Sequence, residues 1–442
     1  MNKKQSLPLN PIEPRVMHID LNSCFAIIEQ QANRLLRGKP VGVAAYDTPR
    51  GFVVAASYEA KYKGVKLGVN VQEARMLCPG IVIMTPDPPK YREAHRLFKE
   101  LMLEYTSDVT PKSIDEFVLD LSGSPRLRSG KTMEEIGLEI KDGVRRRLGE
   151  WVTVNIGIGP NRFLAKYAAG FGKPDGMKII DHTNVEQAYD GMDLIDLPGI
   201  NVRYRRRLQM YGINSPLDFL AADRRTLEKV VFKSIVGYYW YLRLRGYEID
   251  KFDSKHQTIG HQYALPHKTW DRDELSRLLV KLCEKVGRRL RRDGLTAGGI
   301  HLYLSFVNYQ EAGPKANSGF IGGENMSSRL SWHKGQKVGY RLYSTEGIYR
   351  AAKALLKLAE LYNKVRGMSI TVFDLDPIDP EQLSLFDGDA SAGRQLAAER
   401  HISDAVDEIN NRYGEFVITP ATMMDMHGEI LDRIAFGSVR DL

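Results

Sequence analysis

The alternation of strand and helix patterns over the first 181 residues constrains this fold most. An apolar strand at residues 16–19 runs into a helix from about Ser23. Later, a strand of mostly β-branched residues at 152–158 is followed by a helix near residues 162–169. Such alternation is typical of layered α/β or α+β domains. Because 442 residues exceed one hydrophobic core, we expect about two to four domains.

The rest of the chain changes character twice. Residues 182–250 are helical, with short breaks at glycine and proline. Residues 256–376 combine a long amphipathic helix at 273–293 with strands at 299–308 and 368–374, so they predict an α+β unit.

The C-terminal part predicts little regular structure before its last helix. Residues 374–394 are rich in Asp, Pro, Gly and Ser and predict a mobile linker. Helical spacing returns at residues 401–413. The first 14 residues lack an apolar signal region and predict a short disordered lead.

Cysteine spacing and hydropathy limit the setting of the protein. No run of about 18 apolar residues occurs, so we expect no membrane span. Cys24, Cys78 and Cys283 are widely separated and lack metal-type spacing. A reduced, cytoplasmic setting without disulfides is the simplest interpretation.

Positive charge is concentrated in one segment. The whole chain carries a net charge of +8. Residues 255–350 hold 16 Lys and Arg against 8 Asp and Glu, so this segment alone carries +8. A basic surface of domain size suits a polyanion such as nucleic acid, and the alternative is a solvated basic face.

Three carboxylates fall at strand ends. Asp20 ends the apolar strand in HIDLNSCFA, and Asp115 and Glu116 lie at a strand boundary in SIDEFVLDLSG. A carboxylate at the edge of an apolar strand needs a cation or a donor nearby. Converging carboxylates form a hard oxygen site that suits Mg²⁺. The alternative is a solvated turn at Asp115-Glu116 and a helix cap at Asp20.

The motifs HIDLNSCFAIIE and SIDEFVLDLSG together resemble the two acidic motifs of the Y-family DNA polymerases, the DinB/UmuC type. The resemblance implies low-fidelity, template-directed DNA synthesis in damage bypass, repair and SOS mutagenesis. It implies two Mg²⁺ ions held by the catalytic Asp20, Asp115 and Glu116, with a backbone carbonyl from Leu21. Asn22 stands where many members have a second Asp, a position that is not a required ligand.

Four residues match nucleotide-binding positions of that family. Phe25 matches the aromatic residue that excludes a 2′-hydroxyl, although Phe25 alone is typical of a core. Tyr58 and Lys61 match a pair that contacts the triphosphate, with Lys61 where Arg is usual. An exposed amphipathic helix is the alternative there. Lys173, in GFGKPDG, matches a lysine that reaches the β- and γ-phosphates.

Two regions are expected to bind DNA. Residues 194–213 resemble a helix-hairpin-helix whose Pro198, Gly199 and Ile200 would present backbone N–H groups to a phosphate. The alternative is a plain helical connection. The basic third unit would clasp the duplex through Arg288, Arg289, Arg291 and Arg292.

The motif QLSLF lies in the predicted linker. Exposed Leu and Phe in a polar segment are anomalous unless they dock to a partner. The motif resembles the pentapeptide by which bacterial polymerases bind the sliding clamp, which also indicates a bacterial source. The residues concerned are Gln382, Leu383, Leu385 and Phe386. We expect a monomer whose partners are primer-template DNA, a dNTP and this clamp.

The implied fold class is a multidomain α+β right hand with a ferredoxin-like palm. Two alternatives remain: a non-catalytic, clamp-binding polymerase-like scaffold and a nucleotidyl cyclase. Retention of all three carboxylates argues against a scaffold, and a cyclase would not require the hairpin, the basic unit or QLSLF.

The expected parts are the palm (15–30 and 85–181), small fingers (31–84), a helical thumb with the hairpin (182–250), an α+β little finger (256–376), and a linker with the clamp motif and a helical tail (377–442).

Overall fold

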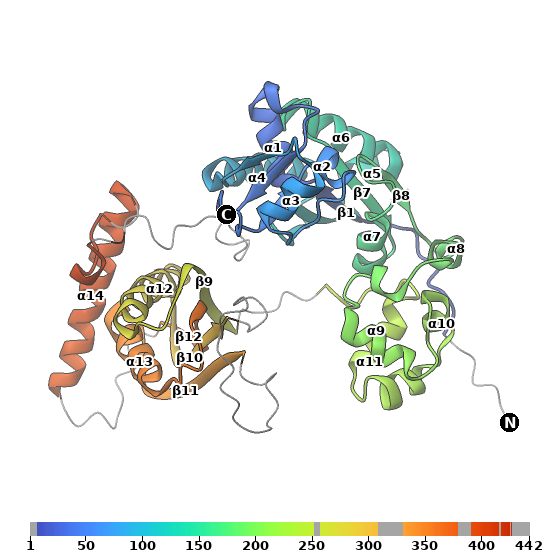
Figure 1. Ribbon diagram of the computed structural model, residues 1–442. Helices are drawn as coiled ribbons and strands as arrows, with labels where there is room; N and C mark the ends of the chain where they lie inside the picture. Colours follow the sequence, from blue (N-terminus) through green and yellow to red (C-terminus); the bar gives the residue numbers. More distant parts are fainter. Residues whose placement is uncertain are drawn as a thin grey trace, which may run out of the picture. The chain divides into compact units, whose positions relative to one another are not determined.

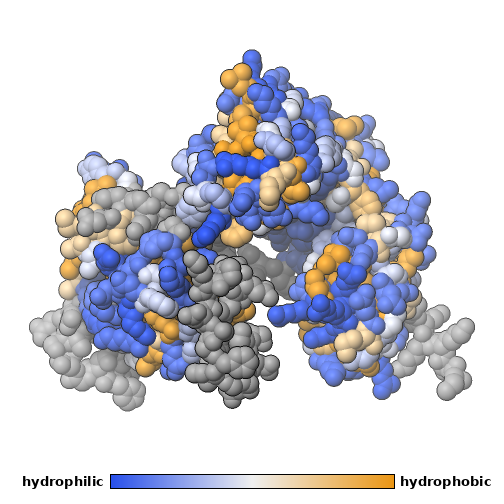
Figure 2. Space-filling model, in the orientation of Figure 1, coloured by the Kyte–Doolittle hydropathy of each residue, from blue (hydrophilic) through white to orange (hydrophobic). Residues whose placement is uncertain are grey.

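The structure is a computed structural model that describes residues 7–251, 257–307, 330–378, 390–414, 417–424 and 426. The described residues form two compact units, one ending at residue 251 and one beginning at residue 257. Figure 1 shows the elements of each unit. The visible faces of both units are mostly hydrophilic (Figure 2), and no described helix is long and apolar enough to cross a membrane.

The first unit is built on a five-stranded sheet with the order β5-β6-β1-β7-β8. β1 pairs antiparallel with both β6 and β7, and β7 pairs in parallel with β8. The first four strands of this sheet in chain order (β1, β5, β6 and β7), with helices between β1 and β5 and between β6 and β7, give the connectivity of a ferredoxin-like sheet. The strands are β1 (Val16–Leu21), β5 (Val109–Pro111), β6 (Glu116–Asp120), β7 (Val154–Gly159) and β8 (Met177–Ile179).

The two faces of β1 differ in chemistry because successive side chains of a strand point to opposite faces. Met17, Ile19 and Leu21 are at most 1% exposed and belong to the main core of this unit. Helices α4 (Pro88–Leu103) and α6 (Met133–Leu148) contribute Phe98, Leu101, Ile136 and Ile140 to the same core. His18 and Asp20 therefore point to the opposite face.

Helix α7 (Arg162–Ala168) packs on that opposite face. It approaches β7 so closely that a Cβ on Gly157 would lie 2.1 Å from the carbonyl oxygen of Ala165. Glycine is required there because a side chain would push the helix off the sheet. This close packing brings Lys166 of α7 beside Glu116 of β6.

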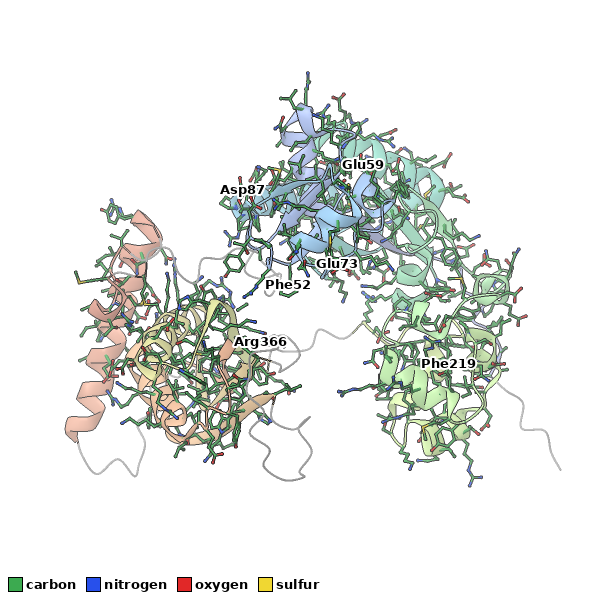
Figure 3. The ribbon with its side chains drawn as sticks, in the orientation of Figure 1. Phe52, Glu59, Glu73, Asp87, Phe219 and Arg366 are labelled. Carbon is green, nitrogen blue, oxygen red and sulfur yellow. The ribbon has the colours of Figure 1, made fainter. Side chains whose placement is uncertain are left out.

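A small subdomain is inserted between α1 (Cys24–Ala32) and α4. Its sheet has the order β3-β2-β4, and its small core includes Val53, Ala56 and Val65. Phe52, Glu59 and Glu73 are labelled on this part of the chain in Figure 3. Its elements are β2 (Val41–Ala44), β3 (Val53–Ala56), α2 (Tyr58–Lys61), α3 (Val71–Leu77) and β4 (Val82–Met84).

A group of short helices completes the first unit. Its core includes Phe219, which is fully buried and labelled in Figure 3, and Trp240. Phe163 of α7 meets the Trp240 ring edge-on at 5.5 Å, which joins this group to the sheet. The helices are α8 (Val185–Tyr189), α9 (Val202–Gln209), α10 (Pro216–Ala221) and α11 (Val236–Arg243).

The second unit has a four-stranded antiparallel sheet with the order β11-β10-β12-β9. Helices α12 (Arg272–Arg292) and α13 (Thr345–Leu358) share its core with the alternate residues Ile300, Leu302 and Leu304 of β10. The helix predicted at residues 273–293 is thus confirmed. The strands are β9 (Thr258–Thr269), β10 (Leu295–Phe306), β11 (Ser331–Leu342) and β12 (Val365–Pro377).

The predicted linker at residues 374–394 is wrong at both ends. β12 continues to Pro377 because its last residues pair with β10, as Asp376 does with Thr296. Helix α14 already begins at Ala390 and runs to Tyr413, well before the predicted residue 401. The residues of β10 that pair with the end of β12 are distant in sequence, so local composition does not reveal this pairing.

Candidate active site

Asp20, Asp115 and Glu116 meet at one end of the β1–β6 pair, and we call them the acidic site. Asp20 is the direct cross-strand partner of Glu116. Asp115 immediately precedes β6, and its carbonyl oxygen accepts the Leu21 N–H at 2.9 Å. The strand period puts Asp20 and Glu116 on the face opposite to the core. The carboxylates that the sequence singled out are therefore brought together.

The repulsion within the acidic site is only partly compensated at Asp115. Burial raises the pKa of Asp115, and the negative charges of Asp20 and Glu116 raise it further. The Ser113 hydroxyl donates to Asp115 Oδ1 at 2.6 Å and offsets part of this effect. A carboxylate in this environment is a place where a cation is stabilised.

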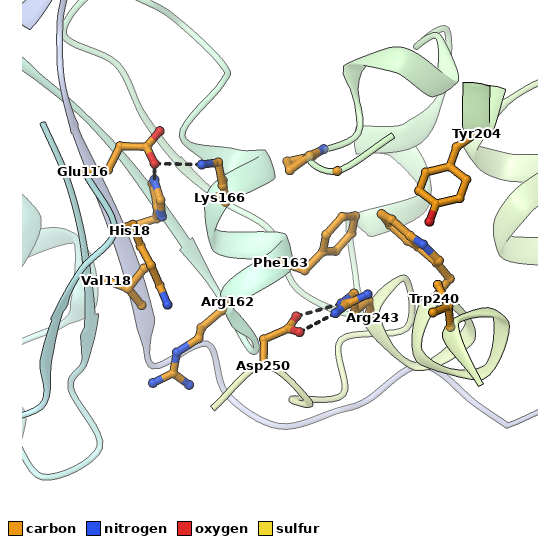
Figure 4. Close-up of a pocket in the computed structure, with 14 residues that line it drawn as sticks. His18, Glu116, Val118, Arg162, Phe163, Lys166, Tyr204, Trp240, Arg243 and Asp250 are labelled. Carbon is orange, nitrogen blue, oxygen red and sulfur yellow. Dashed lines mark hydrogen bonds and ion pairs between the residues drawn. The ribbon is translucent and has the colours of Figure 1, made fainter. Parts of the chain in front are cut away.

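Lysines neutralise the other two members of the acidic site. Lys166 Nζ lies 2.8 Å from Glu116 Oε2, and His18 Nε2 lies 3.8 Å from the same oxygen (Figure 4). Burial opposes the charge of Glu116, but His18 and Lys166 outweigh it and lower its pKa to about 2. Lys173 forms an ion pair with Asp20.

The donor set of the acidic site fits a hard divalent cation. Three carboxylates and a nearby backbone carbonyl are the oxygen ligands that Mg²⁺ prefers. Within the described ranges, no group of three His, Cys, Asp or Glu side chains is arranged to hold a metal ion. The lysine side chains are 44% exposed at Lys166 and 35% exposed at Lys173. Both ion pairs are therefore partly solvated.

The predicted triphosphate contacts gather beside Asp20. The Lys61 ammonium lies 4.5 Å from the centre of the Tyr58 ring and donates to Ser23 Oγ at 2.7 Å. Burial lowers the pKa of Lys61, the nearby Lys173 ammonium lowers it further, and Asp20 opposes both. Burial and the charge of Asp20 raise the pKa of Tyr58 to about 12. Two cations that repel each other in this way suit an anionic ligand.

Phe25 is an anchored core residue next to the acidic site. Its side chain is 3% exposed, and its ring stacks on Tyr91 at 4.5 Å between ring centres. The Tyr91 hydroxyl donates to Glu29 at 2.8 Å, which fixes the ring beneath Phe25. The stacking and this hydrogen bond together hold the Phe25 ring in place.

The predicted hairpin falls at a turn between a short 3-10 helix (Leu194–Asp196) and α9, and it has fewer free donors than expected. Gly199 has a φ of 92°, and a Cβ there would contact the Trp240 ring at 3.5 Å. Pro198 has no N–H, and the Ile200 N–H donates to Leu197 at 3.0 Å. Of the three predicted residues, only Gly199 thus retains an N–H for a phosphate.

A pocket of about 480 Å³ lies between this hairpin and the sheet. Figure 4 shows its lining, which joins the polar sheet face to helices α7 and α11. The lining consists of His18, Lys112, Glu116, Val118, Arg162, Phe163, Lys166, Pro198, Gly199, Tyr204, Val236, Trp240, Arg243 and Asp250.

Two polar residues beside Glu116 were missed in the sequence. His18 is 2% exposed, and its Nδ1 is buried without a hydrogen-bond partner. The position of His18 could have been predicted, because a residue two positions before Asp20 lies on the same face of the strand as Asp20. Lys166 gave no such signal, because its position depends on the close packing of α7.

The arginines predicted to grip DNA are largely used within the second unit. The side chain of Arg291 is 4% exposed and holds Asp407 of α14 through two contacts of 2.6 and 2.9 Å. This corrects the prediction for Arg291, which stabilises the fold from the interior. Arg288 donates to Asn411, Arg289 donates to the Gly260 carbonyl, and Arg292 pairs with Asp293.

The predicted clamp motif, Gln382, Leu383, Leu385 and Phe386, lies outside the described residues.

Family models and curated relatives that match different parts of this chain point to the same protein family. The impB/mucB/samB family model matches residues 19–170, and the model of its C-terminal domain matches residues 256–385. DNA polymerase IV of Pelotomaculum thermopropionicum is 30% identical over 424 residues, which cover 95% of this chain and 97% of that protein. DNA polymerase IV of Moorella thermoacetica is 31% identical and covers 92% of this chain and 96% of its own.

Solved structures with a fold similar to that of this chain are Y-family DNA polymerases. A Y-family DNA polymerase chimera of Dbh and Dpo4 matches with a TM-score of 0.67 and 24% identity, covering 82% of this chain and 99% of its own. The mixed α/β architecture with several sheets is consistent with that fold. The chain belongs to the impB/mucB/samB family, as a bacterial DinB-type member of the Y-family DNA polymerases, the DNA-directed enzymes of translesion synthesis.

Proposed function

We propose that the acidic site catalyses transfer of a nucleotide from a dNTP to the primer 3′-hydroxyl. Asp20, Asp115 and Glu116, with the Leu21 carbonyl, would hold two Mg²⁺ ions. When bound, such ions lower the pKa of the attacking hydroxyl and neutralise the pyrophosphate that leaves. The observation that carries this proposal is the cross-strand pairing of Asp20 with Glu116 beside the buried Asp115.

The nucleotide would enter beside Asp20. Lys61 and Lys173 supply positive charge for the triphosphate, and the Tyr58 hydroxyl adds a donor. As a lysine, Lys61 offers a point charge and no bidentate fork. Phe25 would pack against the sugar and exclude a 2′-hydroxyl, because its ring is held in place by Tyr91.

The domain roles follow from the described elements. The five-stranded sheet and its helices serve as the palm, the β3-β2-β4 insertion as the fingers, and helices α8 to α11 as the thumb. The second unit serves as the little finger. The fingers contain three short strands and two short helices, and such small fingers would leave room for damaged template bases.

Contacts to DNA would come from backbone donors and exposed cations. The Gly199 N–H and the lysines of the adjoining pocket suit a primer phosphate. The QLSLF motif would bind a bacterial sliding clamp, with Leu385 and Phe386 in an apolar pocket of the clamp and Gln382 making polar contacts. The chain would act as a monomer on primer-template DNA.

A catalytically silent scaffold is not favoured, because the relatives that span the chain are DNA polymerases and all three carboxylates are present.

The test is primer extension by a variant carrying Asp115→Ala and Glu116→Ala. We expect extension to fall at least about 100-fold while primer-template binding persists, because removing charge stabilisation at the reacting centre costs this much or more. The matched control is Glu93→Ala with Glu100→Ala, two acids of α4 on the opposite side of the sheet. Unchanged extension by the first variant would refute the assignment.

A further inference from the structure

Lys166 occupies the place beside Glu116 that a metal ion would need. Its ammonium lies 2.8 Å from Glu116 Oε2, while the His18 ring lies on the same oxygen at 3.8 Å. The Lys166 side chain is 44% exposed, so the ion pair is partly solvated. Partly solvated ion pairs stabilise weakly. A divalent ion attracted by the whole acidic site can therefore displace the lysine.

The pocket that Lys166 lines has few other cations to offer. Arg162 is bound to Glu248 at 3.1 Å, and Arg243 is bound to Asp250 at 2.5 Å. In the part of the chain that the structure describes, only the Lys112 ammonium lines this pocket without an acidic partner. A lysine released from Glu116 would double the free positive charge of the pocket.

A residue with a free backbone donor also lines this pocket. Gly199, the one of the three predicted hairpin residues whose N–H donates to no other described residue, lines the pocket together with Lys112 and Lys166. A backbone N–H combined with ammonium groups is the usual environment of a bound phosphate. The triphosphate of the nucleotide is provided for separately by Lys61 and Lys173 next to Asp20. A phosphate of the primer strand is the anion that fits here.

We propose that Lys166 is an exchangeable counter-cation. In the metal-free protein it neutralises Glu116, and when a divalent ion binds Glu116 it moves to a primer-strand phosphate in the adjoining pocket. This inference rests on the proposed function of the acidic site. It couples metal binding to primer binding, and linkage requires each ligand to raise the affinity for the other by the same factor.

The first experiment measures Mn²⁺ binding to the full-length, metal-stripped protein without DNA or nucleotide, by electron paramagnetic resonance. Lys166→Gln removes the competing ammonium, so Mn²⁺ should bind about threefold to tenfold more tightly. Lys166→Arg, which keeps the charge, should bind like the unmodified protein. The matched control is Lys99→Gln, an exposed lysine of α4 on the other side of the sheet. Unchanged Mn²⁺ affinity in Lys166→Gln would overturn the exchange.

The second experiment measures binding of a primer-template that ends in a dideoxynucleotide, with and without Mn²⁺. In the unmodified protein, Mn²⁺ should raise the DNA affinity by about threefold to tenfold. In Lys166→Gln, most of this gain should be lost, while affinity without Mn²⁺ stays nearly the same. An equal loss under both conditions would show a fixed phosphate contact and contradict the exchange.

A further variant separates this inference from the proposed function. Glu116→Gln should weaken Mn²⁺ binding if the acidic site holds metal. If it does so while Lys166→Gln has no effect, only the exchange fails. If neither the unmodified protein nor Glu116→Gln binds Mn²⁺ measurably in the presence of dNTP and primer-template, the proposed function itself fails.

Discussion

Asp20 on β1 lies directly across from Glu116 on β6, in register within an antiparallel pair. Like charges in this relationship normally destabilise a sheet. Here the pair sits at the solvent-accessible end of the polar face, and each carboxylate is held by a lysine from outside the two strands. The two lysines offset the repulsion at Asp20 and Glu116, and the unfavourable part of the arrangement falls on Asp115, whose pKa burial and its acidic neighbours raise.

Two conservative substitutions in the acidic site should change stability in opposite directions. In metal-free protein at pH 7, Asp115→Asn should raise the free energy of unfolding, because burial and the neighbouring charges disfavour its ionised form. Glu116→Gln should lower the free energy of unfolding by about 2 kcal/mol, because His18 and Lys166 stabilise its charge against burial.

Urea unfolding in the presence of EDTA measures both effects. The surface change Glu100→Gln on α4 serves as the control and should alter stability by less than about 0.5 kcal/mol. Destabilisation by both substitutions in the acidic site would contradict the electrostatic description of Asp115.

Replacement of Phe25 should relax the choice of sugar. Phe25→Ala removes the ring that stacks on Tyr91, so incorporation of ribonucleotides relative to deoxyribonucleotides should rise by at least about 10-fold. The same change should cost about 3 kcal/mol of stability, because it opens a cavity in the core. Single-nucleotide incorporation kinetics measure the preference, and Phe25→Tyr, which keeps the flat ring, should retain it. Continued exclusion by Phe25→Ala would place the discriminating group elsewhere.

His95 should make the first unit sensitive to mild acid. Burial lowers the pKa of His95, whose Nδ1 lies 2.8 Å from the Ile114 carbonyl oxygen just before Asp115. A histidine whose folded-state pKa is depressed stabilises the fold above its unfolded pKa of about 6.5 and loses that contribution as the pH falls below it. His95→Gln should therefore reduce the loss of stability between pH 7 and pH 5 by about 1 kcal/mol. Identical pH profiles in unfolding experiments would disprove this role.

Removal of residues 382–386 should affect only synthesis that depends on a clamp. The deletion should reduce extension on clamp-loaded templates by about 10-fold or more, while extension of bare primers persists, because the acidic site is untouched. A five-residue Gly-Ser replacement of the same length controls for linker length. Equal losses on both templates would argue against docking through this segment.

Local sequence determined those parts of the fold and site that depend on periodicity and strand ends. β1, β7 and α12 were predicted because each carries its pattern within a few residues. Asp20 and Glu116 were identified because acids at the ends of apolar strands are unusual.

Features that depend on distant partners were not predictable from the sequence. The sequence predicts that Arg291 is an exposed cation of a basic helix. Its burial depends on Asp407, which lies 116 residues later in the chain and packs against it. The pairing of Lys166 with Glu116 depends on how closely α7 approaches the glycines of β7. Glu399 of α14 is likewise held by a residue distant in sequence, because it accepts a hydrogen bond from Ser344, the N-cap of α13.

The most direct test counts Mn²⁺ ions in the assembled complex. Full-length protein is mixed with a dNTP and a primer-template that ends in a dideoxynucleotide, and bound Mn²⁺ is measured by electron paramagnetic resonance. We expect about two ions per complex, as two-metal sites require, and fewer in Asp20→Asn and in Glu116→Gln. An equal number of bound ions in all three proteins would contradict the metal-binding role of the acidic site.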